Sequence, residues 1–223
     1  MGLHRYFPDA EIVGVDHAPQ PRYPFTFELG DAMTYPLNGF DFVWASPPCQ
    51  GYSVMRHLPW NAGKEYPLLL EPTIDRLRAW GGPYLVENVA GAEGVMRSVA
   101  TYHGWLCGTM FGKRFYRHRL FAAPFMWLQP PHETHRFTIQ GGRALAGRTR
   151  NLVFIDQPRR GIASRMQSHV DNDIVLGVGH QPGAKRAREE MGVEWMNADE
   201  MIQAVPPCYS TYLAQFIPLG AHP

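Results

Sequence analysis

Short apolar segments that close on an acidic or polar residue recur in the N-terminal part of the chain, a pattern typical of buried strands. They are EIVGVD (11–16), FTFELGD (25–31), FDFVWASPP (40–48) and YLVENV (84–89). Between the last two, apolar residues recur at helical spacing in YPLLLEPTIDRLRAW (66–80), and two glycines follow. Strands alternating with a helix predict an α/β fold with a parallel sheet.

Polar side chains that could take part in binding or catalysis lie at or near the ends of the predicted strands. They are Asp16, Asp31, Cys49 and Glu87. In parallel α/β sheets, ligands bind beyond the carboxyl ends of the strands. These four residues are therefore candidates for ligand contacts at the strand ends.

The chain changes character after residue 128, which predicts three parts. Residues 1–128 form the main domain, and residues 129–190 form a small irregular insert dominated by Gly, Pro, Arg and His, with one strand expected at 151–156. Residues 191–223 return to the main domain. This last part reads as two short helices within 198–217, separated by Pro206-Pro207 because proline interrupts a helix.

Composition fits a globular protein of one sizeable domain. The chain has 223 residues, of which 45% are hydrophobic, and no apolar run approaches the roughly 18 residues that would predict a membrane span. A reducing cytoplasm is the expected location, because no signal-peptide pattern is present and three cysteines do not suggest a disulfide framework. No metal site is expected, since no thiolate or carboxylate at suitable spacing completes the pair His132 and His135.

Charge is unevenly spread although the net charge is only +1. Residues 135–165 carry seven arginines against one aspartate, a local excess of six positive charges. Such a block indicates either an anionic partner on one face or a solvated loop.

Cys49 has two interpretations from its surroundings alone. A lone cysteine after a strand is commonly a small buried hydrophobe. Pro47 and Pro48 instead stiffen the backbone before it and fix the direction of the thiol. Glu87, at the end of the next predicted strand, is either a salt-bridge partner or a group that faces the same substrate from another side.

Two arginines follow in an extended segment. Arg117 and Arg119 in RHR alternate, so they should point to the same side. Both are then candidates to act beside Cys49 and Glu87.

The ordered motifs of this chain resemble those of the DNA (cytosine-5)-methyltransferases. The matching stretches are VGVD (13–16), GDA (30–32), PPCQGYS (47–53), VENV (86–89), RHRLF (117–121) and QAVPP (203–207). The resemblance covers the chain apart from the 129–190 insert, and the small size is similar to versions carried by phages and prophages. It implies a Rossmann-like sheet that binds S-adenosylmethionine, with an irregular DNA-recognition insert.

The resemblance also implies a reaction in which cytosine of double-stranded DNA is methylated at carbon 5. Cys49 would attack carbon 6 of a base flipped out of the duplex, because the ring is inaccessible inside the helix. Glu87 would donate a proton to ring nitrogen 3, and Arg119 would bind the base carbonyl oxygen. Arg117 or Arg119 would favour the Cys49 thiolate.

S-adenosylmethionine is the methyl donor that the resemblance implies. Asp16 would accept hydrogen bonds from the ribose hydroxyls and Asp31 from the adenine amino group. The full set expected at the cofactor is Asp16, His17, Asp31, Ala32, Pro48, Gln203, Ala204 and Val205.

DNA contacts are expected from two regions. Gln50 and Ser53 either touch the DNA backbone or cap the turn after Cys49. In the insert, contacts with phosphates are expected from Arg136, Arg143, Arg148 and Arg150.

The chain departs from the family at its front, where the family has a strand and a glycine-rich turn beside the cofactor. Here the sequence opens on MGLHRY, which resembles the segment after that turn. Without that strand, the segments 11–16 and 40–48 should belong to two half-sheets with unpaired inner edges. Three explanations are compatible with this: a start site further upstream, a partner chain or segment that supplies the strand, or an inactive DNA-binding remnant. Another modification at carbon 5 of a pyrimidine is a further alternative to methylation.

Overall fold

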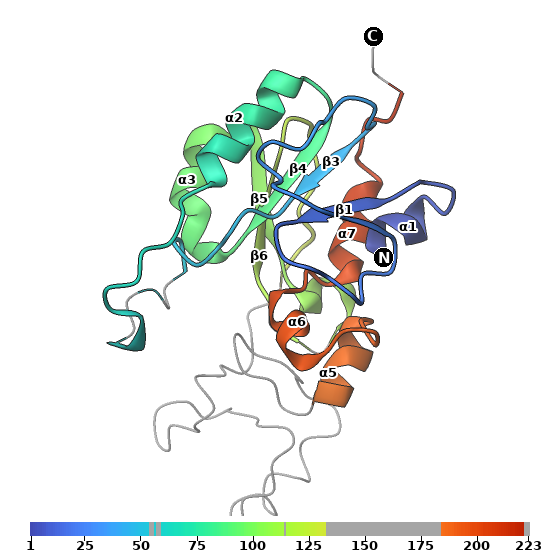
Figure 1. The fold of residues 1–223 in the computed structure, drawn as a ribbon. Coiled ribbons are helices and arrows are strands. Elements are labelled where there is room, and N and C mark those ends of the chain that lie inside the picture. Colours follow the sequence, from blue (N-terminus) through green and yellow to red (C-terminus); the bar gives the residue numbers. More distant parts are fainter. Residues whose placement is uncertain (54–55, 57–58, 114, 133–183, 221–223) are drawn as a thin grey trace, which may run out of the picture.

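The computed structural model describes residues 1–53, 56, 59–113, 115–132 and 184–220 as a mixed α/β structure (Figure 1). Most of the expected insert, including residues 133–183, lies outside these residues. The helices and strands are α1 (Gly2–Tyr6), β1 (Val13–Asp16), β2 (Thr26–Leu29), β3 (Val43–Ala45), α2 (Leu70–Trp80), β4 (Tyr84–Asn88), α3 (Glu93–Val99), β5 (Tyr102–Leu106), β6 (Arg119–Ala123), α5 (Ala184–Met191), α6 (Ala198–Gln203) and α7 (Pro207–Ala214). Short 3-10 turns occupy Pro59–Asn61, Ala90–Ala92 and Gly108–Phe111.

The strands form two separate sheets. In one, β1 pairs with β2 in parallel, from Val13 opposite Thr26 to Asp16 opposite Leu29. The other has the order β3-β4-β6-β5. Within the described part of the chain, β1 and β3 are both edge strands, which agrees with the expectation that the first and third predicted strands do not pair.

The predicted strands pair in parallel as expected, β1 with β2 and β3 with β4, but two strands that the sequence did not predict, β5 and β6, make the larger sheet mixed. β3 and β4 are parallel, whereas β6 is antiparallel to both β4 and β5. β5 and β6 are joined by residues 107–118, whose described part contains the Gly108–Phe111 turn and no α-helix, and such a connection favours antiparallel neighbours.

Helices cover both faces of the larger sheet and divide its core in two (Figure 1). On one face α2 and α3 pack on alternate residues of β4 and β6; the buried set is Leu70, Ile74, Leu77, Tyr84, Val86, Met96, Leu120 and Ala122. α2 ends where predicted, because Gly81 adopts a left-handed conformation with φ of 83°.

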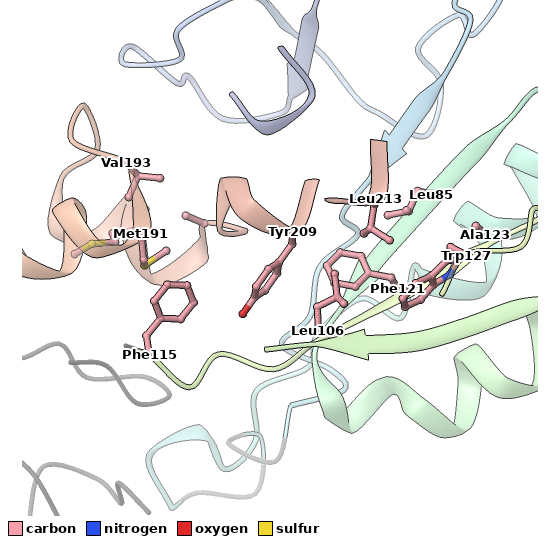
Figure 2. Packing of buried hydrophobic residues seen from close by; sticks show 12 residues of the cluster. Leu85, Leu106, Phe115, Phe121, Ala123, Trp127, Met191, Val193, Tyr209 and Leu213 are labelled. Atoms are coloured by element: carbon pink, nitrogen blue, oxygen red, sulfur yellow. The ribbon is translucent and has the colours of Figure 1, made fainter. Parts of the chain in front are cut away.

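The opposite face of this sheet packs against α7. Figure 2 shows Tyr209 and Leu213 of α7 beside Phe121 of β6 and Leu85 of β4, the residues that alternate with those facing α2. Tyr209 and Leu213 are both fully buried. Burying one such large side chain contributes roughly 1.5–3 kcal/mol, so α7 is a main stabilising element of this layer.

The N-terminal sheet is tied to the rest through α1 and α6. The Thr211 hydroxyl of α7 donates a hydrogen bond of 3.1 Å to the Gly2 carbonyl oxygen of α1. Arg22, which precedes β2, makes a bidentate contact with Glu200 of α6, with its shortest N–O distance at 2.7 Å. Among the described residues, no helix combines the length and the apolar character needed to cross a bilayer.

Candidate functional site

Cys49 lies in a loop whose backbone is held at both ends. β3 stops at Ala45, and the side-chain amide of Asn88 at the end of β4 donates to the Pro47 carbonyl oxygen at 3.1 Å. After the cysteine, the amides of Tyr52 and Ser53 both donate to the Cys49 carbonyl oxygen at 3.0 Å. The thiol is therefore fixed beside the ends of β3 and β4, and it is half-buried.

Glu87 and Arg119 form a buried ion pair on the next two strands. The register places Glu87 opposite Phe121, so Arg119 is the diagonal neighbour of Glu87 on the same face. Arg119 Nε lies 2.8 Å from Glu87 Oε1, and the two side chains are only 11% and 9% exposed. Glu87 is thus the salt-bridge partner that the sequence allowed, and the pair sits where the two strands meet the Cys49 loop.

Arg117 lies close enough to Glu87 and Cys49 for its charge to act on both. It is 6% exposed, and burial together with the neighbouring Arg119 lowers its pKa to about 9, so it remains a cation at neutral pH. The hydroxyl of Tyr209 donates a hydrogen bond of 2.6 Å to the Arg117 carbonyl oxygen and so holds this segment. The alternation of the two arginines thus brings both charges to one place.

Burial dominates the ionisation of the carboxyl and the thiol. Burial raises the pKa of Glu87. Three opposing effects lower it by less in total: the charge of Arg119, a hydrogen bond from Ser46 and the charge of Arg117. Burial likewise raises the pKa of Cys49, against the opposing charge of Arg119. The arginines act in the direction that the sequence predicted, but the net shift disfavours the thiolate in the protein alone. The carboxyl is correspondingly suited to hold a proton.

The acids expected at a cofactor lie at the carboxyl ends of the smaller sheet. Asp16 closes β1, and its carboxylate accepts from the Ala18 amide at 2.8 Å and from Gln20 Nε2 at 3.3 Å. Asp31 follows β2 and accepts from the Met33 amide at 2.8 Å. Each carboxylate keeps further acceptor capacity, because two oxygens offer about four lone-pair sites.

The remaining cofactor candidates differ in exposure. His17 and Ala32 are exposed, and His17 Nδ1 lies 3.2 Å from Asp16 Oδ1. Pro48 and Val205 are partly buried, Ala204 is buried, and Gln203 is the exposed last residue of α6.

The DNA candidates divide between described and undescribed residues. Gln50 is exposed in the turn after Cys49, and the Ser53 amide helps close that turn. The four arginines of the insert, Arg136, Arg143, Arg148 and Arg150, lie outside the described residues, as does the expected strand 151–156.

Sequence reasoning missed two residues that position the site. Ser46 hydrogen-bonds to Glu87, and Asn88 fixes Pro47. Both lie inside motifs that were singled out, but their roles depend on which strands pair. The sequence also did not predict the cluster of Cys107, His118 and His132, which the structure brings together.

The described site combines a thiol, a buried carboxyl with a raised pKa and two buried cations. This set can add a sulfur nucleophile to an electron-poor ring and supply a proton as charge develops there. Gln50, directly after the thiol, is exposed. In comparisons with known proteins, no protein-family model and no curated protein matches the chain.

Proposed function

We propose that the protein methylates carbon 5 of cytosine in duplex DNA, through a covalent adduct of Cys49 at carbon 6. The observation that carries this proposal is the buried Glu87–Arg119 pair, 2.8 Å apart, at the strand ends beside the Cys49 loop. An ion pair of this kind is costly to bury, so a role beyond stability would explain its place next to a thiol. The resemblance of the surrounding motifs to cytosine-5 methyltransferases supplies the substrate class.

The thiol performs the first step of the proposed mechanism. Cys49 Sγ forms a bond to carbon 6, and the electron pair of the ring double bond shifts toward carbon 5 and nitrogen 3. Because burial raises the pKa of Cys49, its proton must leave as the substrate enters, and the charges of Arg119 and Arg117 favour the resulting anion.

Glu87 handles the charge that appears on the ring. Its raised pKa allows it to carry a proton near neutral pH and to give that proton to nitrogen 3. As the carboxyl becomes an anion, Arg119 at 2.8 Å stabilises it, and the other guanidinium nitrogens are available to the base carbonyl oxygen. Once carbon 5 carries the methyl group, the proton on nitrogen 3 returns to Glu87 and the proton on carbon 5 passes to water. The electron pair of the carbon–hydrogen bond then re-forms the double bond between carbons 5 and 6, and the bond from carbon 6 to Cys49 Sγ breaks.

S-adenosylmethionine would supply the methyl group that carbon 5 takes up. The residues that would hold it are Asp16 and Asp31, whose carboxylates follow parallel strands and retain acceptor sites for hydroxyl and amino groups. Ala204 and Val205, directly after α6, would pack against its apolar parts.

Exchange of the hydrogen on carbon 5 tests the thiol step separately from methyl transfer. Long unmethylated duplex DNA with tritium at carbon 5 of cytosine is incubated with the protein without any methyl donor. If Cys49 adds to carbon 6, carbon 5 takes a proton from water, and reversal releases tritium. Cys49→Ser should abolish the release, and Glu87→Gln should slow it by about 10²–10⁴-fold.

The control variant is Cys208→Ser, which alters a second partly buried thiol on α7 and should leave tritium release unchanged. Adding S-adenosylmethionine should then yield 5-methylcytosine by mass spectrometry of the nucleosides. A different product at carbon 5 would identify another pyrimidine modification. If the protein binds DNA but neither releases tritium nor forms a modified nucleoside, the proposal is overturned in favour of a DNA-binding protein without activity.

A further inference from the structure

Three metal-ligating side chains meet at the end of the β5–β6 pair. They are Cys107, directly after β5, His118, directly before β6, and His132, after β6. Their ligand atoms all lie within 4.8 Å of one another, and among the described residues this is the only such group that contains a thiol and two imidazoles. None of the three belongs to the Cys49 site.

The register of the two strands explains why the first two residues meet. The ladder ends with Leu106 opposite Arg119, and one further step places Cys107 opposite His118. In the sequence these residues are far enough apart to conceal the pairing, whereas in an antiparallel pair they are cross-strand neighbours.

Trp105 brings the third residue to the group. Its backbone amide donates to Gln129 Oε1 at 3.0 Å, which holds the segment leading to His132 against β5. The indole then packs against both imidazoles, with ring centroids 4.7 Å from His118 and 4.6 Å from His132. The two histidines are therefore positioned by the same side chain.

The chemistry of the group matches a zinc-type ion. One thiolate and two neutral imidazoles form a common ligand set for Zn²⁺, with a fourth position left for water or another ligand. Bonds of about 2.0–2.3 Å would separate tetrahedral ligand atoms by about 3.3–3.8 Å, so rotations of the side chains would close the group onto an ion.

Two further observations favour ligation over simple packing. The Thr109 hydroxyl lies 3.3 Å from Cys107 Sγ and can donate to a thiolate there. Cys107 itself is fully buried, which would shield a metal–sulfur bond from water.

We propose that Cys107, His118 and His132 bind one divalent zinc-type ion. His118 stands between Arg117 and Arg119, and alternation along an extended segment turns it to the face opposite the two arginines. The ion would thus clamp the segment that carries both arginines of the Cys49 site, from the other side of the strand. The site does not depend on the proposed methyl transfer.

Cobalt and zinc titrations of the full chain test this proposal. Protein purified without chelators should contain about one zinc per chain by elemental analysis. Replacement with CoCl₂ should produce a thiolate-to-cobalt charge-transfer band in the near ultraviolet. Other histidines of the chain cannot produce that band, so it reports on a cysteine ligand alone.

Variants assign the ligands. Cys107→Ser should abolish the cobalt–thiolate band, and His118→Gln or His132→Gln should weaken zinc binding at least about tenfold, in line with the loss of a metal ligand or its support. His103→Gln, which changes an exposed histidine of β5, is the matched control and should bind as the unaltered chain does.

Far-ultraviolet circular dichroism checks that each variant is folded. If Cys107→Ser does not fold, His132→Gln decides the matter, because His132 is only partly buried and lies outside the sheet. Absence of both bound zinc and the cobalt–thiolate band in the unaltered chain would overturn the proposal. Equal zinc affinity of the His132→Gln variant and the unaltered chain would also overturn it.

Discussion

The Glu87–Arg119 pair predicts an unequal response to the loss of either partner. Arg119 Nε lies 2.8 Å from Glu87 Oε1, and the side chains of Glu87 and Arg119 are almost wholly buried, with exposures of 9% and 11%. The centres of the two delocalised charges are then taken as about 4 Å apart. At an effective dielectric constant near 20, their attraction is about 4 kcal/mol, while removal of each ion from water costs several kcal/mol. The raised pKa of Glu87 indicates that burial outweighs attraction for the carboxyl.

Glu87→Gln leaves a buried guanidinium that cannot lose its proton. We expect it to lower the free energy of unfolding by at most about 3–5 kcal/mol at pH 5, and by less at pH 8, because the raised pKa of Glu87 makes the unaltered protein lose stability as pH rises while glutamine does not titrate. Arg119→Met instead leaves a carboxyl that escapes by staying protonated. At pH 5 its cost should therefore be clearly smaller than that of Glu87→Gln.

The cost of Arg119→Met should grow with pH. Without Arg119, the pKa of Glu87 in the folded protein rises further above the value of about 4.3 in the unfolded chain. Between these two pKa values the folded state binds more protons, so stability falls as pH rises. The double variant removes both charges and should be within about 1 kcal/mol of the unaltered protein, or more stable.

Urea unfolding followed by far-ultraviolet circular dichroism at pH 5 and pH 8 measures all four proteins. The control is the exposed pair Arg97–Glu93 on α3, where Glu93→Gln should cost no more than about 0.5 kcal/mol although the N–O distance is 2.6 Å. The two residues are not coupled as argued if both single variants lose the same free energy of unfolding at both pH values and the loss in the double variant equals the sum of the two.

Two further predictions concern the segments around the site. Tyr209→Phe removes the buried hydroxyl that donates to the Arg117 carbonyl oxygen and should lower the free energy of unfolding in urea by about 1–3 kcal/mol. Tyr212→Phe, which removes an exposed hydrogen bond, should lower it by less than about 0.5 kcal/mol, and equal losses would refute the positioning role of Tyr209. Alkylation of Cys49 by iodoacetamide, located by mass spectrometry, should be slow at pH 7 and accelerate as pH rises, because burial raises the pKa of the thiol. Arg119→Met should slow the reaction further, since the charge of Arg119 favours the thiolate. An alkylation rate that does not change from pH 7 to pH 9 would contradict this.

The pattern of apolar residues locates four short strands, although β2 is mostly exposed. β1, β2, β3 and β4 all lie inside the predicted segments, and α2 ends at the predicted glycine. The split into two sheets also agrees with the expectation from the sequence.

Strand direction could not be predicted in the same way. β5 and β6 pair antiparallel because of the connection between them, and no apolar periodicity reports on that connection. The 5-residue helix α1 and the 7-residue helix α3 are also too short for helical spacing to stand out.

The candidate site was predictable to the extent that it depends on local geometry. Alternation along RHR is enough to place Arg117 and Arg119 on one side. The partner of Arg119 depends on the register of β4 and β6, which sets Glu87 on the diagonal. The net ionisation of Cys49 depends on how deeply the thiol is buried, and a linear sequence carries no measure of that depth.

The same alternation explains how one strand can serve two sites. Odd positions at the start of β6 bring arginine charges to Glu87, while His118 at the intervening position turns toward Cys107 and His132. A substitution at His118 can therefore act on both, because it is one backbone step from each arginine. Its effect on tritium release, measured beside its effect on zinc content, would show whether the clamp proposed on one face supports the chemistry proposed on the other.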